Sequence, residues 1–425
     1  MTELYKDLEF RGLVYQSSSL ELEKEINSDG SLTVYAGFDP TAGSLHVGHL
    51  LQLCLLKRFA SKDHKVVALV GGATGLIGDP SGKTTERPML DESQVQINVE
   101  SLSNQINRFF GSDSKNLSVV NNLDWWSEMT VTEFLRNVGK YATVNQMMAK
   151  DSVKNRLENP ETGISFAEFS YMLLQAYDFL YLYENYGVNL QVGASDQWGN
   201  IVQGIDLIRR VKRFEGARGL TTPLVTKSDG QKFGKSESGT VWLDAELTSP
   251  YELYQFFYNV EDASAIRYLK YFTFLGQDEI VDLERSLRQE ARLRMAQKRL
   301  AFEIVRLVHG SDAADAAKLS SEGIFGKSVE EIDIEGLISR VPTVALGESQ
   351  VLDQSIDTVV SLSKLTSSRG EAKRLISQGG LYLNNAKVDS VRSVGRMDLV
   401  KGKYLILRAG KTKQLVVMVD FKSVT

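Results

Sequence analysis

Two short apolar segments near the N-terminus are each followed by a glycine-rich turn. The first is LTVYA at 32–36 and the second is VVALV at 66–70, and an apolar helix is expected between them over about 45–60. β-Branched and aromatic residues favour strands, so the order is strand, helix, strand. We therefore expect an α/β fold with a Rossmann-like, doubly wound parallel sheet, whose ligands bind at the carboxyl ends of the strands.

The remaining chain changes character along its length. Residues 91–160 look mainly helical with a turn at 111–116, and residues 340–354 contain Pro and Gly without periodicity, as in a linker. The other expected elements are a helix at 165–186, a strand at 190–193, a helix from about 197, helices from Pro250 to about 310, a helix at about 368–378, and strands in GGLYLNN and YLILRAG. A chain of 425 residues should form several domains. We predict a Rossmann-like domain with a helical insertion at 1–240, an α-helical domain at 241–345 and a small α+β domain at 346–425.

Charge is distributed unevenly between the two ends of the chain. The net charge is −5, but residues 351–425 carry 13 Lys/Arg and 6 Asp/Glu, a local +7 that leaves −12 for residues 1–350. A basic segment on an acidic body is typical of a protein that binds nucleic acid with one part only. The N-terminus has early acids and no signal-like apolar core, and Cys54 is the only cysteine, so we expect a cytoplasmic protein without disulfides.

The stretch GGATGLIGDPSGKTTERP at 71–88 contains part of a phosphate-binding loop. Gly82, Lys83 and Thr84 match its second half, but the position five before Gly82 is Ile77 and not glycine. The spacing therefore argues against a P-loop.

Two histidines, His46 and His49, stand in GSLHVGH on the expected first turn of the helix after the first strand. Helix N-termini attract anions, and two imidazoles there can donate hydrogen bonds to phosphate. The alternatives are a surface pair or a zinc site, and the sequence nearby offers no third and fourth zinc ligand.

A second candidate motif is KSDGQKFGKSES, in which Lys232 and Lys235 flank Phe233-Gly234 and Ser236 follows. Lysines three residues apart on a Gly/Ser-rich loop can reach a polyphosphate. Taken alone, this pattern is more typical of a charged surface loop.

A third group lies on the helix at 165–186. Tyr171, Gln175 and Asp178 fall within about 60° of one another at 100° per residue, on a helix otherwise rich in Phe, Leu and Met. A carboxylate among such neighbours needs hydrogen-bond donors. Either this stripe binds a polar ligand or it belongs to an internal hydrogen-bond network.

Together these motifs resemble the class I aminoacyl-tRNA synthetases, since HVGH is similar to HIGH and KFGKS to KMSKS. YAGFDPTAGSLHVGH, GGATGLIGDPSGK, YMLLQAYDFL and QVGASDQWGNI extend the resemblance to the bacterial-type tyrosyl-tRNA synthetases over nearly the whole chain. The resemblance implies an aminoacyl-tRNA ligase that joins L-tyrosine to tRNA(Tyr), using ATP with Mg²⁺ as a substrate complex and no protein-bound metal. It also implies a cytoplasmic homodimer that does not bind membranes.

The resemblance also assigns roles to residues. It implies tyrosine binding by Tyr35, Asp79, Tyr171, Gln175, Asp178, Gln191 and Gln197. It implies ATP and adenylate contacts by Gly37, Asp39, His46, His49, Gly193, Asp196, Lys235 and Ser236. The groups expected to stabilise the leaving pyrophosphate are His46, His49, Lys83, Arg87, Lys232 and Lys235. The helical domain would bind the anticodon, and the tail resembles the small RNA-binding domain named after ribosomal protein S-four, with Arg369, Lys373, Arg374 and Lys387 as its RNA contacts.

Some positions depart from that family. Ala36 and Gln52 replace a common cysteine and threonine near the ribose, so no ribose contact is assigned to them, and KFGKS differs from KMSKS at two positions. Two alternatives stay open: a tryptophanyl relative, disfavoured by Tyr35 with Asp178, and an RNA-binding protein that has lost catalysis.

Overall fold

The structure is a computed structural model. It describes residues 3–28, 32–81, 90–157, 163–213, 215–226, 233–236, 239–324, 334, 338, 341–410 and 413–421. The chain divides into two compact units, one formed by Met1–Asp244 with Ile266–Val281 and the other by Ala245–Ala265 with Asp282–Thr425. The prediction of three domains is not tested by this division and stays a prediction. Among the described residues, no helix is both long and apolar enough to cross a membrane.

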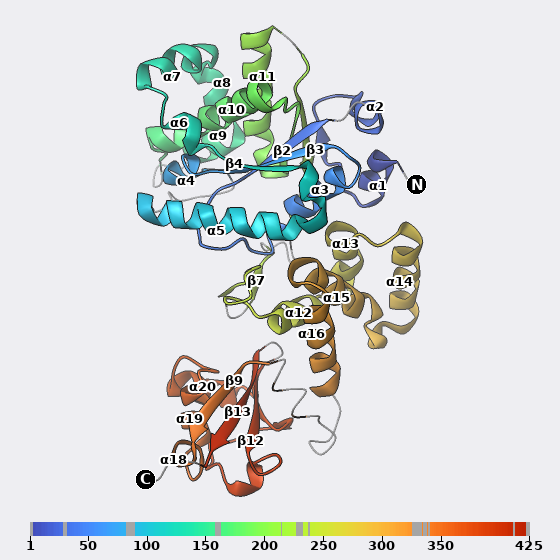
Figure 1. Cartoon of the computed structure of the whole chain (residues 1–425), viewed down its shortest axis with the longest axis vertical. Helices are drawn as coiled ribbons and strands as arrows, with labels where there is room; N and C mark the ends of the chain where they lie inside the picture. Colours follow the sequence, from blue (N-terminus) through green and yellow to red (C-terminus); the bar gives the residue numbers. More distant parts are fainter. Residues whose placement is uncertain are drawn as a thin grey trace. The chain divides into compact units, whose positions relative to one another are not determined.

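A six-stranded sheet forms the centre of the first unit (Figure 1). Its strand order is β1-β6-β5-β2-β3-β4, and all neighbours are parallel except β1 and β6. The strands are β1 (Gln16–Ser17), β2 (Thr33–Phe38), β3 (Lys65–Val70), β4 (Leu117–Asn121), β5 (Leu190–Ala194) and β6 (Arg218–Thr222). The chain runs outward from β2 to β4 on one side and from β5 to β6 on the other. The strand order therefore reverses between β2 and β5, where a doubly wound sheet binds its ligands.

Helices cover both faces of this sheet. Figure 1 shows α5 on one face, and α10 and α11 on the other. The helices of the unit are α1 (Leu4–Phe10), α2 (Leu22–Asn27), α3 (Leu50–Ala60), α4 (Thr74–Ile77), α5 (Glu92–Phe110), α6 (Leu123–Trp126), α7 (Val131–Asn137), α8 (Val144–Met148), α9 (Asp151–Leu157), α10 (Phe166–Tyr186) and α11 (Trp198–Lys212). The Ser165 side chain caps the start of α10, and Gly187 ends it in the left-handed region. These signals explain why the sequence located this helix to within one residue.

One local prediction for this unit was wrong, because the helix expected from about residue 45 begins at Leu50. The region 91–160 is mainly helical with a turn at Gly111–Asn116, as predicted, but it also contains β4, which was not predicted. β4 is a partly exposed edge strand of five residues, so it lacks the long apolar run that identified β2 and β3.

The second unit contains helices and a smaller sheet. Its helices α12 (Pro250–Tyr258), α15 (Met295–His309) and α16 (Ser311–Ile324) confirm the helical pattern expected after Pro250. The division between the units falls within α13 (Asp262–Phe272) and α14 (Gln277–Glu290). Ser249 begins α12 with a capping box to Glu252, followed by Pro250 at the first helical position.

The smaller sheet has the order β11-β10-β12-β13-β9. Its elements are β9 (Thr343–Gly347), α18 (Glu348–Val351), α19 (Ile356–Leu362), α20 (Arg369–Ser377), β10 (Leu381–Leu383), β11 (Ala386–Lys387), β12 (Tyr404–Ala409) and β13 (Lys413–Asp420). The prediction of a linker at 340–354 was wrong, because this segment contains β9, which pairs in parallel with β13, with Thr343 opposite Val416. A strand of five residues whose partner lies about 70 positions later in the chain gives no local signal.

Candidate active site

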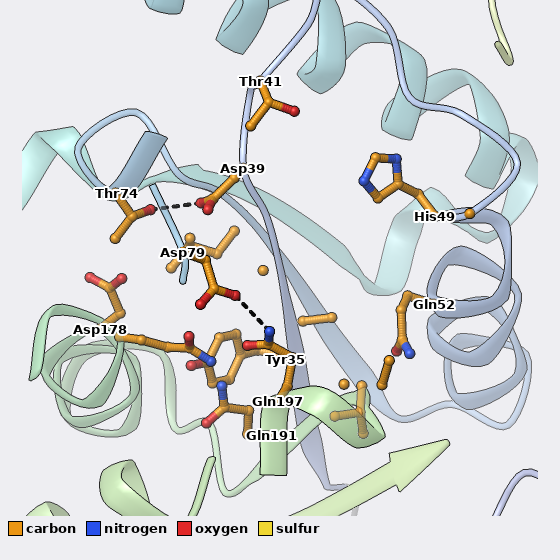
Figure 2. Close-up of a pocket in the computed structure, with 18 of the residues that line it drawn as sticks. Tyr35, Asp39, Thr41, His49, Gln52, Thr74, Asp79, Asp178, Gln191 and Gln197 are labelled. Atoms are coloured by element: carbon orange, nitrogen blue, oxygen red, sulfur yellow. Dashed lines mark hydrogen bonds between the residues drawn. The ribbon is translucent and has the colours of Figure 1, made fainter. Parts of the chain in front are cut away.

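A pocket of about 270 Å³ opens at the carboxyl ends of β2 and β5, where the strand order reverses (Figure 2). This volume is close to the lower end of the range for small-ligand sites. The pocket is lined by most of the residues that the sequence singled out: Tyr35, Gly37, Asp39, His46, His49, Asp79, Tyr171, Gln175, Asp178, Gln191, Gly193 and Gln197. Residues from three distant segments of the chain therefore meet at one place. Asp196 lies beside it in the 3-10 turn Ser195–Gln197 but not among the lining residues.

Asp178 is the most completely enclosed acid of the pocket, with 2% of its surface exposed. The indole nitrogens of Trp125 and Trp126 each donate to Oδ1 at 2.8 Å, and Nδ2 of Asn122 donates to Oδ2 at 3.0 Å. Burial raises the pKa of Asp178 from 3.8 to about 7, although these three hydrogen bonds oppose the rise. The carboxyl group is thus held in a fixed orientation and close to its point of ionisation at neutral pH.

Tyr35 lies on β2 with its ring against Phe179 of α10, at 5.3 Å between ring centroids. Burial and the neighbouring charge of Asp178 raise the pKa of Tyr35 well above its usual value, so the hydroxyl keeps its proton. Within the described part of the chain, neither this hydroxyl nor Oε1 of Gln191 has a hydrogen-bond partner, although both atoms are buried. Buried polar atoms without partners are costly, so both are candidates for contact with a ligand.

A chain of hydrogen bonds connects Asp178 with Asp39, at the other side of the pocket. Asn122 donates to both Asp178 and Oγ1 of Thr74, and Thr74 donates to Oδ1 of Asp39 at 2.9 Å. The Tyr171 hydroxyl donates to Oδ2 of Asp39 at 2.8 Å. Gly71 must be glycine here, since a Cβ atom would lie 2.3 Å from Oδ1 of Asp39.

A second network surrounds Asp79. Its Oδ2 accepts from Nε2 of Gln197 at 2.7 Å, and its Oδ1 accepts from the backbone N–H of Ser81 at 2.9 Å. Asn200 donates to Oε1 of both Gln197 and Gln175. Two carboxylates, Asp39 and Asp79, thus lie near Tyr171 and raise its pKa further, after burial. Such a site favours a positively charged group of a ligand.

The sequence predicted that both histidines lie on the first turn of a helix, and this was wrong. His46 forms an isolated β-bridge with Trp242, and His49 occupies the N-cap position directly before α3. The rings stack at 3.9 Å between centroids, and Gly48 lies so close that a Cβ atom there would be 2.7 Å from the His46 ring. The residues that the structure describes include no cluster of three or more His, Cys, Asp or Glu side chains able to hold a metal ion.

The segment of KFGKS that the structure describes runs beside these histidines. Val47 donates its N–H to Val241 O, and Val241 donates to Gly234 O. The backbone of Lys235 and Ser236 forms β7 (Lys235–Ser236), which pairs with β8 (Gly239–Thr240). Lys83, Arg87 and Lys232, and with them the GKT of the candidate P-loop, lie outside the described residues. The backbones of the HVGH and KFGKS motifs are therefore neighbours.

Sequence reasoning missed several polar residues of the site. These are Thr41, Gln52 and Thr74 in the pocket lining, and Asn122, Trp125, Trp126 and Asn200 behind it. The signal that could have found three of them is NNLDWW, which follows the carboxyl end of β4, but β4 itself was not predicted.

In the second unit, the four predicted RNA contacts lie on α20 and on β11. Arg369 Nε donates to Oδ2 of Asp357 at 3.1 Å, and Lys373 Nζ lies 4.0 Å from the same oxygen. Asp357 is completely buried, and its pKa is lowered by its hydrogen bonds and by these cations, which outweigh the effect of burial. Lys387 lies 3.6 Å from Asp389. The cationic ends of Arg369 and Lys373 are thus held at the surface by an acid beneath them.

Comparisons with known proteins identify the family of this chain. The sequence profile of "tRNA synthetases class I (W and Y)" matches residues 27–326, and that of the "Tyrosine--tRNA ligase SYY-like C-terminal domain" matches residues 333–417. The chain is 46% identical to the tyrosine–tRNA ligase of Roseiflexus castenholzii, over 97% of this chain and 98% of that protein. It is 45% identical to that of Geobacillus stearothermophilus, over 98% and 99%.

Solved structures support the same conclusion. A C-terminally truncated mitochondrial tyrosyl-tRNA synthetase of Aspergillus nidulans superposes with a TM-score of 0.69 and 34% identity, covering 76% of this chain and 95% of that chain. The tyrosyl-tRNA synthetase of Archaeoglobus fulgidus, at 16% identity and a TM-score of 0.56, shows the shared fold. This chain therefore belongs to the class I tRNA synthetases of the tryptophan and tyrosine family.

Proposed function

We propose that this chain is a tyrosine–tRNA ligase that activates L-tyrosine with ATP and transfers it to the 3′-terminal adenosine of tRNA(Tyr). The main support for tyrosine as the substrate is the buried Tyr35 hydroxyl, which lines the same pocket as Asp178. Within the described residues this hydroxyl has no hydrogen-bond partner. A phenol can donate its proton to the Asp178 carboxylate and accept one from Tyr35. Curated relatives of nearly the same length carry the name of this activity.

The tyrosine pocket distinguishes substrates by the hydroxyl group. Phenylalanine would leave the buried Tyr35 hydroxyl without a partner and would offer no further donor to Asp178. Tyrosyl-tRNA synthetases are themselves a standard example of this kind of discrimination. At the other end of the substrate, Asp79, Tyr171 and Gln175 surround the ammonium group. Gln191 and Gln197 complete the lining.

In the first step, a carboxylate oxygen of tyrosine attacks the α-phosphorus of Mg-ATP. The bond from the α-phosphorus to the bridging oxygen breaks, and pyrophosphate leaves with the electron pair. His46, His49, Lys83, Arg87, Lys232 and Lys235 stabilise the negative charge that builds up on the leaving group. The adenylate lies along Gly37, Asp39, Gly193, Asp196 and Ser236. No side chain has to act as a nucleophile, since the reaction depends on positioning and charge.

In the second step, a ribose hydroxyl of the terminal adenosine attacks the acyl carbon and AMP leaves. Arg369, Lys373, Arg374 and Lys387 contact the tRNA backbone through charge, and the helical domain at 241–345 contacts the anticodon. The enzyme is a homodimer in the cytoplasm, where its tRNA and ATP are found.

A tyrosine-dependent ATP–pyrophosphate exchange assay tests this proposal. We expect labelled pyrophosphate to enter ATP with tyrosine, and not with tryptophan or phenylalanine at equal concentration. The His46→Asn variant should exchange more slowly while its tyrosine affinity stays the same. Exchange that depends on tryptophan, or no exchange with any amino acid, would contradict the proposal.

A further inference from the structure

We propose that Tyr268, on α13, is a positioning residue for adenylate formation, because it fixes the KFGKS backbone beside the HVGH histidines. This inference rests on the proposed function and extends it to a residue outside the pocket. Tyr268 belongs to the first unit and has 2% of its surface exposed. It contacts Thr226, which precedes KFGKS in the chain, and Phe233, which is part of that motif.

The first contact is a hydrogen bond. The Tyr268 hydroxyl donates to the carbonyl oxygen of Thr226 at 2.9 Å, and Nη2 of Arg267 donates to the same oxygen, also at 2.9 Å. Two donors on one carbonyl determine both its position and its direction.

The second contact is aromatic. The ring of Phe233 lies 4.7 Å from that of Tyr268 and 5.7 Å from that of Phe272, on the next turn of α13. Phe233 has 8% of its surface exposed and also donates its N–H to Val225 O at 3.3 Å. One tyrosine side chain thus holds Thr226 through its hydroxyl and Phe233 through its ring.

The anchor at Phe233 is the second residue of the KFGKS motif itself. Gly234 has a φ of +104°, and a Cβ atom there would lie 3.2 Å from Cγ2 of Val47. Val47 lies between His46 and His49 in the sequence, so Gly234 packs against the backbone that carries both histidines. A shift of Phe233 would be transmitted directly to Gly234 and Lys235.

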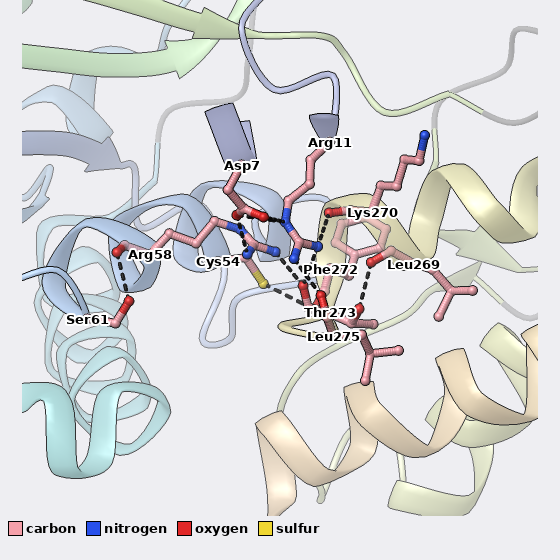
Figure 3. A network of polar contacts seen from close by, with 10 residues as sticks. All are labelled: Asp7, Arg11, Cys54, Arg58, Ser61, Leu269, Lys270, Phe272, Thr273 and Leu275. Atoms are coloured by element: carbon pink, nitrogen blue, oxygen red, sulfur yellow. Dashed lines mark hydrogen bonds and ion pairs between the residues drawn. The ribbon is translucent and has the colours of Figure 1, made fainter. Parts of the chain in front are cut away.

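The helix that carries Tyr268, α13, is itself held by hydrogen bonds to α3, the helix that follows His49. Figure 3 shows Arg11, which directly follows α1, and Arg58 of α3 reaching carbonyl oxygens at and just beyond the end of α13. Arg11 donates to Lys270 O at 3.1 Å, to Thr273 O at 3.0 Å and to Leu275 O at 2.6 Å, while Arg58 also donates to Thr273 O. Cations at a helix C-terminus are stabilised by its partial negative charge.

These contacts form a closed path around the site. His49 directly precedes α3, α3 supplies Arg58 to the end of α13, and α13 supplies Tyr268 to Thr226 and Phe233. Gly234 then returns to Val47, two residues before His49. The two phosphate-binding motifs therefore share one connected support. Tyr268 is the side chain that contacts both Thr226 and Phe233, with Arg267 and Phe272 each contacting one of them.

The test is Tyr268→Phe, which removes the hydroxyl and keeps the ring, in the full-length chain. We expect the single-turnover rate of tyrosyl-adenylate formation to fall about three- to tenfold, as for the loss of one buried hydrogen bond. Tyrosine affinity should stay within about twofold, since Tyr268 lies outside the pocket. Phe233→Leu, which removes the stacked ring, should lower the rate as well and leave tyrosine affinity unchanged. Tyr271→Phe is the matched control, because Tyr271 lies on the same helix with its ring edge-on to Phe272.

Three results would overturn the inference. The first is a Tyr268→Phe rate equal to that of the wild type, which together with a lower urea midpoint would mean that Tyr268 only stabilises the fold. The second is an equal loss in the Tyr271→Phe control, and the third is a loss of tyrosine affinity as large as the loss of rate. Failure of the proposed function is distinguishable, since the wild type would then form no adenylate.

Discussion

At Asp178, burial and hydrogen bonding act on the same carboxyl group in opposite directions. Burial dominates and raises the pKa to about 7, while Asn122, Trp126 and Trp125 favour the charged form. The carboxylate of Asp39 adds a smaller electrostatic contribution to the rise. A phenol hydroxyl would add a fourth donor, so tyrosine binding should favour the ionised acid.

This balance predicts a pH-dependent affinity for tyrosine. If the ionised carboxylate is the binding form, the apparent Kd should fall about tenfold between pH 6 and pH 8. Equilibrium dialysis over that range measures it, because neither the phenol nor the α-amino group of tyrosine titrates there to a large extent. Asp178→Asn should bind tyrosine more weakly and without this pH dependence. A wild-type Kd that stays constant from pH 6 to pH 8 would contradict the prediction.

The same raised pKa affects folding stability in the opposite direction: tyrosine affinity should rise with pH, whereas the stability of the ligand-free protein should fall. Between pH 4 and pH 7 the native carboxyl group keeps a proton that the unfolded chain, with a pKa of 3.8, has lost. The ligand-free protein should therefore lose this part of its stability as the pH rises through that window. Urea unfolding of wild type and Asp178→Asn provides an independent check, since the variant should lack this contribution.

Residues on one helix were easier to predict than residues brought together by the sheet. Tyr171, Gln175 and Asp178 were found because helical periodicity alone places them on one stripe, and all three line the pocket. Asn122 and Trp126 were missed because their position depends on β4, an edge strand without a clear apolar pattern. Their contact with Asp178 joins positions more than 50 residues apart, which no local pattern encodes.

At the scale of elements, the helices between β4 and β5 expose more apolar surface than a solvated region requires. α7 has no buried residue, and exposed side chains recur along α7 to α10 at Val131, Leu135, Val144, Met148, Leu157 and Phe166. Exposed apolar side chains that recur in one region are typical of a protein interface. A second copy of this chain is the partner that we propose, because a two-fold dimer buries the same patch on both copies.

A charge in this region should therefore break the dimer. Leu135 is 55% exposed, so Leu135→Asp should cost the folded monomer little while placing two unpaired carboxylates in the interface. Sedimentation velocity should show a dimer for the wild type and a monomer for the variant, with similar urea midpoints. Ile97→Asp is the control, since Ile97 is 61% exposed and lies on α5, which covers the other face of the sheet from α10 (Figure 1). A dimer that survives Leu135→Asp, or a wild-type monomer, would refute this assignment of the interface.

Long-range pairing also limited prediction at this scale. β2, β3 and β5 are buried strands whose apolar runs predicted them directly. β9 has five residues, of which only Leu346 is buried, and it pairs with β13 at the far end of the sequence. The apparent linker is therefore the edge of a sheet.

Over the whole molecule, charge is divided between two tasks. Residues 1–350 carry a net −12 and contain the pocket, whereas residues 351–425 carry +7. An acidic body repels RNA except where it makes specific contacts. A basic segment attracts the phosphate backbone, and this attraction weakens as the salt concentration rises. Because β9 (Thr343–Gly347) completes the small sheet, the separable segment includes β9 and does not begin at residue 351.

Removing the chain from residue 341 onward should separate the two reactions. Pyrophosphate exchange should stay within about twofold of wild type, since every lining residue of the pocket is retained. Charging of tRNA should fall by about tenfold or more at physiological salt, because several phosphate contacts are lost. The truncated fungal relatives of known structure, at 34% identity, show that such a shortened chain can fold in this family. In the full-length chain, Arg374→Glu combined with Lys387→Glu should weaken charging and leave exchange unchanged. Equal loss of exchange and charging in the truncated chain would mean that the C-terminal segment supports the active site itself, and the division of tasks inferred from charge would be wrong.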